Sequence, residues 1–507
     1  MASPDFNTFK THFNAGKTQL LHRWIAADLV TPVSAYLKLS RDKTHHVLFE
    51  SVEGGQTLGR YSIIGFDPDL IWTCHKGQVE ITYPAPSLHG HLKNASVQST
   101  SALKSLRETV NANRIDITDP TLPPMAVSGL FGYIGYDMVR LIEDTPDTNP
   151  DNLQIPDSIL MRPSALAIFD NVKNMICIVV PIYTHTGNSD APAQDIYDTA
   201  CAKLDAIAKT IDSPLDRNHL TSTTRLTTPL TVNSNMTRAD YHTAVTKAVD
   251  YIHQGEIFQV VPGQRFDVDF DLPSTELYRA LRRLNPSPFM FHVQCGDFAI
   301  VGSSPEILVR VRGGTATIRP IAGTRKRGTT EAEDRALAED LLSDPKERAE
   351  HLMLLDLGRN DIGRIADFGS VKVTDQFIIE RYSHVMHIVS NVEGRLRKGL
   401  DCIDALFAGF PAGTVSGAPK VRAMEIIDAL EKSRRGYYGG GVGYISGNGE
   451  MDTCIALRTA LVKDGKVYVQ AGGGVVADSD PEFEYQETIN KSKAVIKAAE
   501  LAVENAR

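Results

Sequence analysis

The distribution of apolar and polar residues along the chain predicts a mixture of short strands and amphipathic helices. Strand-like runs rich in β-branched and aromatic residues occupy residues 47–51, 61–64 and 175–180. Several of the predicted strands alternate in polarity instead of forming continuous apolar runs, which favours antiparallel sheets. The pattern therefore predicts an α+β fold.

The second half of the chain alternates strands with helices. Thr237 is a good N-cap for a helix that continues to about His253. Between the two halves, residues 213–235 concentrate Ser, Thr, Pro and Asn, a composition typical of a loop or linker. We therefore expect an N-terminal region over residues 1–220 and a second region over residues 237–507, packed together as one compact unit.

Two later segments repeat the same helix-start design. In each, an Asp suited to the N-cap precedes a Pro suited to the first helical position. These pairs are Asp344-Pro345 and Asp480-Pro481. Each start is followed by two glutamates that lie three residues apart on one helical face. They are Glu347 and Glu350 in the first segment and Glu484 and Glu487 in the second, where Lys491 lies four residues further on.

If the two acidic faces meet, their carboxylates converge. Two such charges about 4 Å apart repel by roughly 4 kcal/mol at a typical effective dielectric, so a cation is the natural occupant. Oxygen ligands without a nearby Cys or His suit Mg²⁺ better than zinc or copper. The alternative, which the spacing alone favours, is a pair of solvated acidic faces near helix N-termini.

Composition excludes several other classes of function. The 507 residues are 42% apolar and 23% charged, and the net charge of -9 disfavours nucleic-acid binding. No apolar run approaches the roughly 20 residues that span a bilayer, and the first residues lack the pattern of a signal peptide. We expect no membrane association and a cytoplasmic location. The six cysteines form no C-x-x-C pair and are expected to be buried small hydrophobes.

Arg458, the glycine clusters and His387 are weaker candidates when each is taken alone. Arg458 lies in a run of alternating polarity, residues 454–461, with small neighbours on its own face, and it suits a bidentate grip on a carboxylate. A structural ion pair is equally compatible with that stretch. Glycine clusters at residues 439–443 and 472–474 allow close approach to an anion but are more often turns. His387 lies in a strand-like run, where a lone His is more often a core residue.

Read in order, six motifs resemble those of the chorismate-utilising enzymes. The resemblance is strongest over residues 237–500 and looser over the N-terminal half. It implies a sandwich of antiparallel β-sheets flanked by helices, chorismate as substrate and Mg²⁺ as cofactor. The motifs are PIAGT (320–324), ERAEH (347–351), DLGRND (356–361), PAGTVSGAPK (411–420), IALRT (455–459) and EYQE (484–487).

The resemblance also implies roles for the residues at matching positions. Glu350 and Glu487 would hold Mg²⁺ on the ring carboxylate of chorismate, with Glu347 and Glu484 in support. Glu306 would be the general acid that protonates the departing C4 hydroxyl, and His387 would assist the later loss of pyruvate. The remaining assignments are Arg458, Tyr438, Gly473 and Gly474 on the enolpyruvyl carboxylate, Gly323, Thr324 and the catalytic Thr414 on the ring, and Lys491 in substrate binding.

Two positions distinguish the branches of this family. Isochorismate- and salicylate-forming members place a Lys base in the segment that contains Gln259, which is neutral here. Many aminodeoxychorismate-forming members carry a Lys where this chain has Ala322. Both residues favour direct amination of C2 by ammonia, followed by elimination of pyruvate to give anthranilate for tryptophan biosynthesis. The aminodeoxychorismate-forming branch is the enzymatic alternative, and a catalytically inactive tryptophan-binding regulatory module is the alternative from another class.

Two segments resemble the tryptophan feedback pocket of the family. By this resemblance Ser51, Pro288 and Met290 would contact the inhibitor, and Glu50 would help to hold its amino group. The chain has no G-x-C-x-G nucleophile segment of a glutamine amidotransferase. Ammonia is therefore expected from a separate glutamine amidotransferase subunit in a hetero-oligomer, or directly from solution.

Overall fold

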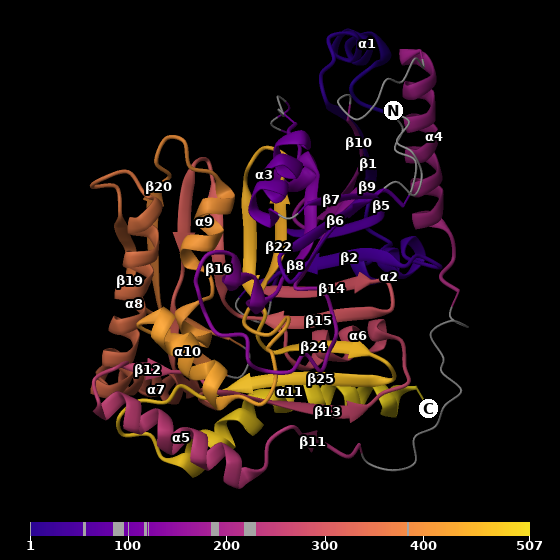
Figure 1. Ribbon diagram of the computed structural model, residues 1–507. Helices are drawn as coiled ribbons and strands as arrows, with labels where there is room; N and C mark the ends of the chain where they lie inside the picture. Colours follow the sequence, from indigo (N-terminus) through magenta and orange to yellow (C-terminus); the bar gives the residue numbers. More distant parts are fainter. Residues whose placement is uncertain are drawn as a thin grey trace.

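The strands of the chain join in an antiparallel network that folds into two facing sheets (Figure 1). The computed structural model describes residues 2–53, 57–84, 96–99, 101–115, 119, 121–183, 192–216, 230–382 and 385–506. Within these residues, 21 strands belong to the network. Two short strand pairs stand apart from it: β3 (Val52–Glu53) with β4 (Thr57–Leu58), and β12 (Gln259–Val260) with β21 (Gly417–Ala418).

The first sheet runs from the N-terminal strands to strands near the C-terminus. Figure 1 shows its central strands stacked one above another, with β2 directly above β14. In order of pairing it consists of β1 (Gln19–Ala26), β10 (Met175–Ile182), β9 (Ser158–Asp170), β5 (Tyr61–His75), β2 (His45–Glu50), β14 (Phe289–Cys295), β15 (Phe298–Ser304), β24 (Thr459–Lys463), β25 (Lys466–Gly472), β13 (Gly263–Asp269) and β11 (Asn233–Ser234).

The second sheet shares β5 and β9 with the first. The long strand β5 changes register between Pro68 and Leu70, and its second half continues into the other sheet. The other strands of this sheet, in order, are β7 (Ser96–Ser99), β6 (Gln78–Thr82), β8 (Gly129–Ile134), β22 (Gly441–Ser446), β23 (Met451–Ile455), β16 (Ile307–Arg312), β17 (Thr315–Ile318) and β20 (Val385–Arg395), which also pairs with β18 (Ile321–Lys326) and β19 (Lys372–Arg381).

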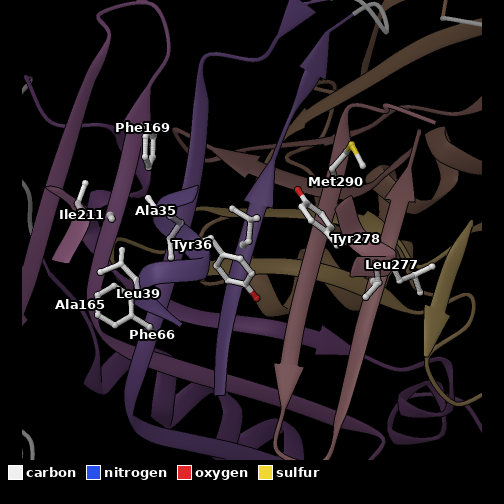
Figure 2. Packing of buried hydrophobic residues seen from close by; sticks show 14 of the residues in the cluster. Ala35, Tyr36, Leu39, Phe66, Ala165, Phe169, Ile211, Leu277, Tyr278 and Met290 are labelled. Carbon is white, nitrogen blue, oxygen red and sulfur yellow. The ribbon is translucent and has the colours of Figure 1, made fainter. Parts of the chain in front are cut away.

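Three hydrophobic layers hold the two sheets and their helices together. The central layer, which includes Phe131, Leu166 and Phe291, lies between the sheets. A second layer covers the outer face of the first sheet, and Figure 2 shows part of it. Its helices are α1 (Phe6–Asn14), α2 (Pro32–Leu39), α4 (Ala193–Asp212), α6 (Ser274–Leu284) and α11 (Pro481–Asn505). The third layer packs α3 (Ala102–Ala112), α8 (Pro345–Ile365) and α9 (Cys402–Gly409) on the second sheet.

The remaining helices close the ends of the sandwich. A smaller cluster joins α5 (Arg238–His253) to α10 (Lys420–Leu430), and another joins α7 (Glu331–Ser343) to β20. Short 3₁₀ helices are η1 (Pro124–Val127), η2 (Tyr136–Leu141) and η4 (Gly413–Val415). The predicted α+β fold with a sandwich of antiparallel sheets flanked by helices is confirmed.

The elements predicted from the sequence are present, but one run of alternating polarity is divided between two strands. The strands predicted at residues 47–51, 61–64 and 175–180 correspond to β2, β5 and β10, and Thr237 caps α5, which ends at His253. The run over residues 454–461 is not one strand. It breaks into β23, in the second sheet, and β24, in the first, because the chain passes between the sheets at residues 456–458.

Several sequence expectations concern features that the structure describes only in part. Residues 217–229 of the predicted linker, and residues 383 and 384 of the run before His387, lie outside the described residues.

All six cysteines are free thiols, and five are buried as expected, whereas Cys201 is half-buried. Among the helices of the described ranges, none has both the length and the apolar character needed to cross a membrane.

Candidate active site

The two predicted acidic helix starts are the N-termini of α8 and α11. The Asp344 side chain accepts hydrogen bonds from the backbone N–H groups of Lys346 and Glu347, and Pro345 opens α8. The Asp480 side chain accepts a hydrogen bond from the Phe483 backbone and caps α11 in the same way. Both predicted helix starts are therefore confirmed, and each cap orients the glutamates of the following turns.

The carboxylates of the two helices lie close enough to influence each other. Burial and the charge of Glu347 raise the pKa of Glu350, and the charge of Glu487 on the other helix adds to the rise. Lys491 and Gln259 oppose it. The Gln259 side-chain amide donates a hydrogen bond to Glu350 Oε1 at 3.2 Å. The charge of Glu487 on α11 therefore reaches Glu350 on α8, and a shared cation site at the two acidic faces stays a prediction.

Glu484 and Glu487 are held in different ways on α11. The Ser479 hydroxyl donates to Glu484 Oε1 at 2.7 Å, while Glu484 Oε2 is buried and has no hydrogen-bond partner in the described part of the chain. Burial raises the pKa of Glu484 to about 8, and Glu487 contributes to the rise. Burial also acts to raise the pKa of Glu487, but the Lys491 ammonium, 2.8 Å from Glu487 Oε1, outweighs it and leaves that pKa low.

Three glycines bring the backbone against these carboxylates. A Cβ on Gly323, which has φ +68°, would lie 3.0 Å from Glu347 Oε2. A Cβ on Gly473 would lie 2.7 Å from Glu484 Oε2. At Gly474 it would lie 2.7 Å from Gln259 Nε2 and 3.9 Å from Glu350 Oε1. Any larger residue at Gly473 or Gly474 would displace the acidic side chains or Gln259, so the glycines keep this recess open.

The acidic recess suits a hard cation. Among the described residues, no three His, Cys, Asp or Glu side chains already form a metal-ligating group. Mg²⁺, however, commonly takes only one or two protein carboxylates and completes its shell with substrate and water. The donors here are all oxygens, one of them the unpaired, buried Glu484 Oε2. The raised pKa values of Glu350 and Glu484 reflect burial and mutual repulsion, which a cation would relieve.

Glu306 and Arg458 both lie where the chain passes from one sheet to the other. Glu306 follows β15 and precedes β16, and Arg458 lies between β23 and β24 with φ +51°. Backbone hydrogen bonds tie the two crossings together, from Ile455 N to Glu306 O at 3.0 Å and from Ser303 N to Arg458 O at 3.3 Å. The two crossings therefore place the Glu306 carboxyl group and the Arg458 guanidinium at the same end of the sandwich.

Glu306 has the properties of a buried acid. Its side chain is only 6% exposed, and burial raises its pKa to about 8 against the opposing effects of Thr414, the Ile321 backbone and Arg458. The hydroxyl of Thr414, in η4, is buried and makes no normal hydrogen bond among the described residues, yet the Thr414 side chain still acts to lower the pKa of Glu306. Glu306 and Thr414 line the same small cavity of about 30 Å³. At neutral pH Glu306 carries a proton that it can donate.

His387 is held in one tautomer by the backbone. Its Nδ1 lies 2.9 Å from the Gly323 carbonyl and 3.1 Å from Thr324 Oγ1. Because a carbonyl only accepts, Nδ1 carries the proton and Nε2 keeps a free lone pair. Burial and the charge of Arg458 lower the pKa of His387 to about 4. At neutral pH the imidazole is thus a neutral base.

Arg458 and Tyr438 are the two side chains assigned to the enolpyruvyl carboxylate. Burial lowers the pKa of Arg458, with Tyr382 and Glu306 opposing. Among the residues that the structure describes, no side chain forms an ion pair or a hydrogen bond with the Arg458 guanidinium, so it is not the structural pair that the sequence left open. The Tyr438 hydroxyl lies against Gly472, whose carbonyl accepts a hydrogen bond from Lys491 at 2.9 Å.

The four residues of the predicted inhibitor site line one cavity of about 1220 Å³. Glu50 of β2 pairs in register with Met290 of β14, and Ser51 and Pro288 lie beside them on the same cavity wall. The Glu50 carboxylate is already engaged, because the Arg282 guanidinium donates to both of its oxygens, at 2.8 and 3.1 Å. Tyr278, seen near Met290 in Figure 2, donates to Glu50 as well.

Several residues around these sites could not be found from local patterns. Arg282 and Tyr278 lie on α6, an ordinary amphipathic helix, and only the packing of α6 on the first sheet brings them to Glu50. The sequence predicts Gln259 as a neutral residue that determines specificity. Its hydrogen bond to Glu350 is seen only in the structure. Ala322 is buried in β18, next to Gly323, and pairs with Ile388 of β20.

Comparison with known proteins identifies close relatives along nearly the whole chain. A family model described as chorismate binding enzyme matches residues 46–497. The chain is 53% identical over 503 residues to anthranilate synthase component 1 of Cereibacter sphaeroides, which covers 98% of this chain and 97% of that protein. It is 48% identical over 481 residues to the protein of the same name from Pseudomonas aeruginosa, with 94% of each covered.

Solved structures agree with the sequence relatives. The crystal structure of anthranilate synthase component I from Streptococcus pneumoniae matches with a TM-score of 0.73 at 35% identity, covering 93% of this chain and 99% of that one. The menaquinone-specific isochorismate synthase from Escherichia coli matches with a TM-score of 0.66 at 20% identity, covering 98% of this chain and 100% of that one. The second likeness concerns the fold alone.

Proposed function

The chain belongs to the chorismate binding enzyme family, and on that premise we propose that it carries out the anthranilate synthase component 1 reaction. In this reaction ammonia adds to C2 of chorismate, the C4 hydroxyl leaves as water, and pyruvate is then eliminated to give anthranilate. The observation that carries the proposal is the meeting of four features at one end of the sandwich. They are the acidic recess, the protonated Glu306, the neutral His387 and the unpaired Arg458.

The acidic recess is the proposed position of the ring carboxylate. Glu350 and Glu487 would hold Mg²⁺ there, with Glu347 and Glu484 in support, and the bound ion would neutralise and orient the ring carboxylate. Lys491 would offset the charge of Glu487, which it already contacts. Gly473 and Gly474 leave room for the substrate between the two helix starts.

The enolpyruvyl carboxylate would bind on the opposite side, at Arg458. The Arg458 guanidinium is available for a bidentate grip because no side chain of the described residues pairs with it, and Tyr438 and the backbone of the glycine segment would complete the site. Gly323, Thr324 and Thr414 would position the ring between the two carboxylate sites. Holding both ends of the substrate fixes C2 and C4 relative to the catalytic groups.

Amination would use Glu306 as the acid. Ammonia attacks C2, the ring double bonds shift, and the C4–O bond breaks as Glu306 gives its proton to the leaving hydroxyl, which departs as water. The added nitrogen then loses one proton, which balances the proton taken from Glu306. Gln259 cannot act as a base toward water and Ala322 offers no amine, so free ammonia is the favoured nucleophile at this site.

Elimination would use His387 as the base. As the C3–O bond breaks and the enolpyruvyl group leaves, the ring proton at C2 must be removed for the ring to become aromatic. Protonation of the released enolpyruvate at its methylene carbon gives pyruvate and balances the proton taken from C2. Nε2 of His387 keeps a free lone pair because Nδ1 is committed to the Gly323 carbonyl. This assignment makes His387 a proton acceptor in the second half of the reaction only.

Product identification tests the proposal directly. The purified chain is incubated with chorismate, ammonium and Mg²⁺, and the products are separated by chromatography. Anthranilate and pyruvate in equal amounts are expected. Accumulation of 4-amino-4-deoxychorismate without anthranilate would assign the chain to the aminodeoxychorismate-forming branch, and tryptophan binding without turnover would make it a regulatory module.

The source of ammonia and the response to tryptophan are part of the same proposal. A separate glutamine amidotransferase subunit would supply ammonia in a cytoplasmic hetero-oligomer, in keeping with the component naming of the relatives. The N-terminal region, residues 1–220, would contribute Glu50 and Ser51 to the tryptophan site, next to Pro288 and Met290 of the catalytic region, residues 237–507.

Tryptophan inhibition is tested by filling the proposed pocket. Ser51→Phe places a large ring in the cavity that Ser51 lines, so tryptophan should no longer inhibit while anthranilate formation continues. Inhibition curves with ammonium as the nitrogen source measure the effect without the partner subunit. Undiminished inhibition in this variant would place the inhibitor elsewhere.

A further inference from the structure

We propose that Tyr382 is a positioning residue shared by the active site and the cavity of about 1220 Å³. Its ring orients His387, and its hydroxyl is held by the Arg319–Glu380 ion pair of the cavity. The inference rests on the proposed function. It assigns a role to a residue that none of the sequence motifs singled out.

Tyr382 lies in the wall between the two spaces. It lines the large cavity together with Arg319 and Glu380, and the same cavity contains the proposed inhibitor residues Glu50 and Met290. On its other side, the pKa of Arg458 responds to Tyr382 and Glu306 together. Tyr382 is 8% exposed, so it belongs to the packed wall and is not a surface residue that happens to lie nearby.

The hydroxyl of Tyr382 is directed toward the cavity side. It donates a hydrogen bond to Glu380 Oε2 at 2.9 Å. Arg319 donates to both oxygens of the same carboxylate. A hydrogen bond to an ionised carboxylate is stronger than one between neutral groups. Any ligand that draws Arg319 or Glu380 toward itself would therefore pull on the Tyr382 hydroxyl.

The ring of Tyr382 is directed toward the catalytic base. Its centroid lies 5.4 Å from that of His387, and the planes meet at 62°, an edge-on contact. This contact and the hydrogen bond from Nδ1 to Gly323 together fix the imidazole plane and therefore the direction of the Nε2 lone pair. The backbone of Tyr382 is fixed too, because Arg327 donates to its carbonyl at 2.7 Å and its N–H bonds to Val385.

The first experiment distinguishes a positioning role of the Tyr382 ring from a purely structural role. Tyr382→Leu removes the edge contact with His387, so the elimination step should slow and part of the aminated intermediate should leave before it loses pyruvate. The ratio of this intermediate to anthranilate is measured by chromatography with chorismate, Mg²⁺ and ammonium. A Tyr382→Leu enzyme that releases anthranilate with no more intermediate than the wild type overturns the positioning role.

The second experiment tests the hydroxyl. Tyr382→Phe keeps the ring, so its product ratio should match the wild type, but it breaks the link to Glu380. Loss of a hydrogen bond to a charged group should raise the tryptophan concentration needed for half-inhibition by about ten-fold. Tryptophan binding, measured by equilibrium dialysis, should persist. Inhibition as strong as in the wild type overturns the role of the hydroxyl.

Tyr133→Phe is the matched control, because the Tyr133 hydroxyl also bonds within the core, to the Pro156 carbonyl, but on β8. Its product ratio and its inhibition should equal those of the wild type. A change of the same size in this control would mean that loss of any buried hydroxyl suffices, which overturns the inference. A wild-type chain that makes no anthranilate would instead overturn the proposed function itself.

Discussion

Glu306 and His387 reach opposite protonation behaviour in the same buried centre. Burial disfavours the charged form of each, so it raises the pKa of the carboxyl to about 8 and lowers that of the imidazole to about 4. Between these values Glu306 holds a proton and His387 lacks one. One low-dielectric site thus provides both the acid for the first step and the base for the second at neutral pH.

The pH dependence of turnover follows from these two groups. As the pH rises through about 8, Glu306 loses its proton, so kcat/KM for chorismate should fall about ten-fold per pH unit on the alkaline side. As the pH falls through about 4, His387 gains a proton and elimination should slow. Initial rates with saturating Mg²⁺ and ammonium, recorded across the pH range that contains both pKa values, measure the fall on the acid limb and on the alkaline limb of the pH profile.

Thr414 provides a control for the alkaline limb. The Thr414 side chain lowers the pKa of Glu306, so Thr414→Val should move the limb to higher pH, whereas Thr414→Ser should keep it in place. The position of the limb is read independently of the overall rate. A limb that stays at the same pH in Thr414→Val, or that survives in Glu306→Gln, would show that another group controls it.

Individual site residues are predicted from the sequence only where the family resemblance marks them. The carboxylates of α8 and α11 and Arg458 belong to the six ordered motifs, whereas His387 lies outside them and is assigned by the wider resemblance. Tyr382, Arg282 and Tyr278 carry no such mark, because their roles depend on side-chain contacts across sheets and helices that are remote in sequence. Burial of Glu306, which sets its protonation, was likewise a consequence of packing.

At the scale of elements, local chemistry predicted the helix starts but not the sheet crossing. An N-cap is specified by neighbouring residues, and the Asp-Pro pairs indicated α8 and α11 correctly. The alternating pattern continues through residues 454–461 although both faces of β23 and β24 are buried. Cys454 and Leu461 pack in the layer between the sheets, whereas Ile455 and Ala460 pack in the outer layers. The period of two carries no information about a crossing at Arg458, where a single left-handed residue changes the sheet.

The cap of α11 should influence both stability and the metal site. Asp480→Ala removes the hydrogen bond to Phe483 N, which should lower the free energy of unfolding by about 1 kcal/mol. The first turns, which carry Glu484 and Glu487, should loosen, so more Mg²⁺ should be needed for half-maximal activity. Denaturant unfolding and Mg²⁺ activation curves measure the two effects.

Asp480→Asn and Asp401→Ala are the matched variants for this prediction. Asn is a good N-cap and should restore both properties. Asp401 caps α9 through Ile403 and Asp404, a helix that carries none of the proposed metal ligands. Asp401→Ala should lose stability without a change in the Mg²⁺ requirement. Equal Mg²⁺ effects at both caps would remove the link between the α11 cap and the metal site.

At the scale of the whole molecule, the two halves of the chain share their sheets. The linker composition at residues 213–235 suggested a boundary, and the separation into regions 1–220 and 237–507 stays a prediction. β2 of the first half pairs with β14, and β8 pairs with β22. Composition marks a connection between segments, but strand pairing across it depends on long-range register, which one sequence does not reveal.

This interleaving predicts that the catalytic half does not fold alone. A fragment of residues 230–507 would expose the edges of β14 and β22 that β2 and β8 cover in the whole chain, together with the apolar layer between the sheets. It should show no cooperative thermal transition and no turnover, and co-expression with residues 1–229 should restore both. A fragment that melts cooperatively and forms anthranilate by itself would show the halves to be independent.

The central claim is that α8 and α11 together hold one divalent cation at the substrate carboxylate. Mn²⁺ in place of Mg²⁺ makes this measurable by electron paramagnetic resonance, in a titration of the whole chain in the presence of chorismate. We predict one bound Mn²⁺ per chain that Mg²⁺ displaces, lost in Glu350→Ala and equally in Glu487→Ala, because each helix supplies a ligand. Retention of one equally tight Mn²⁺ in both variants would contradict the account.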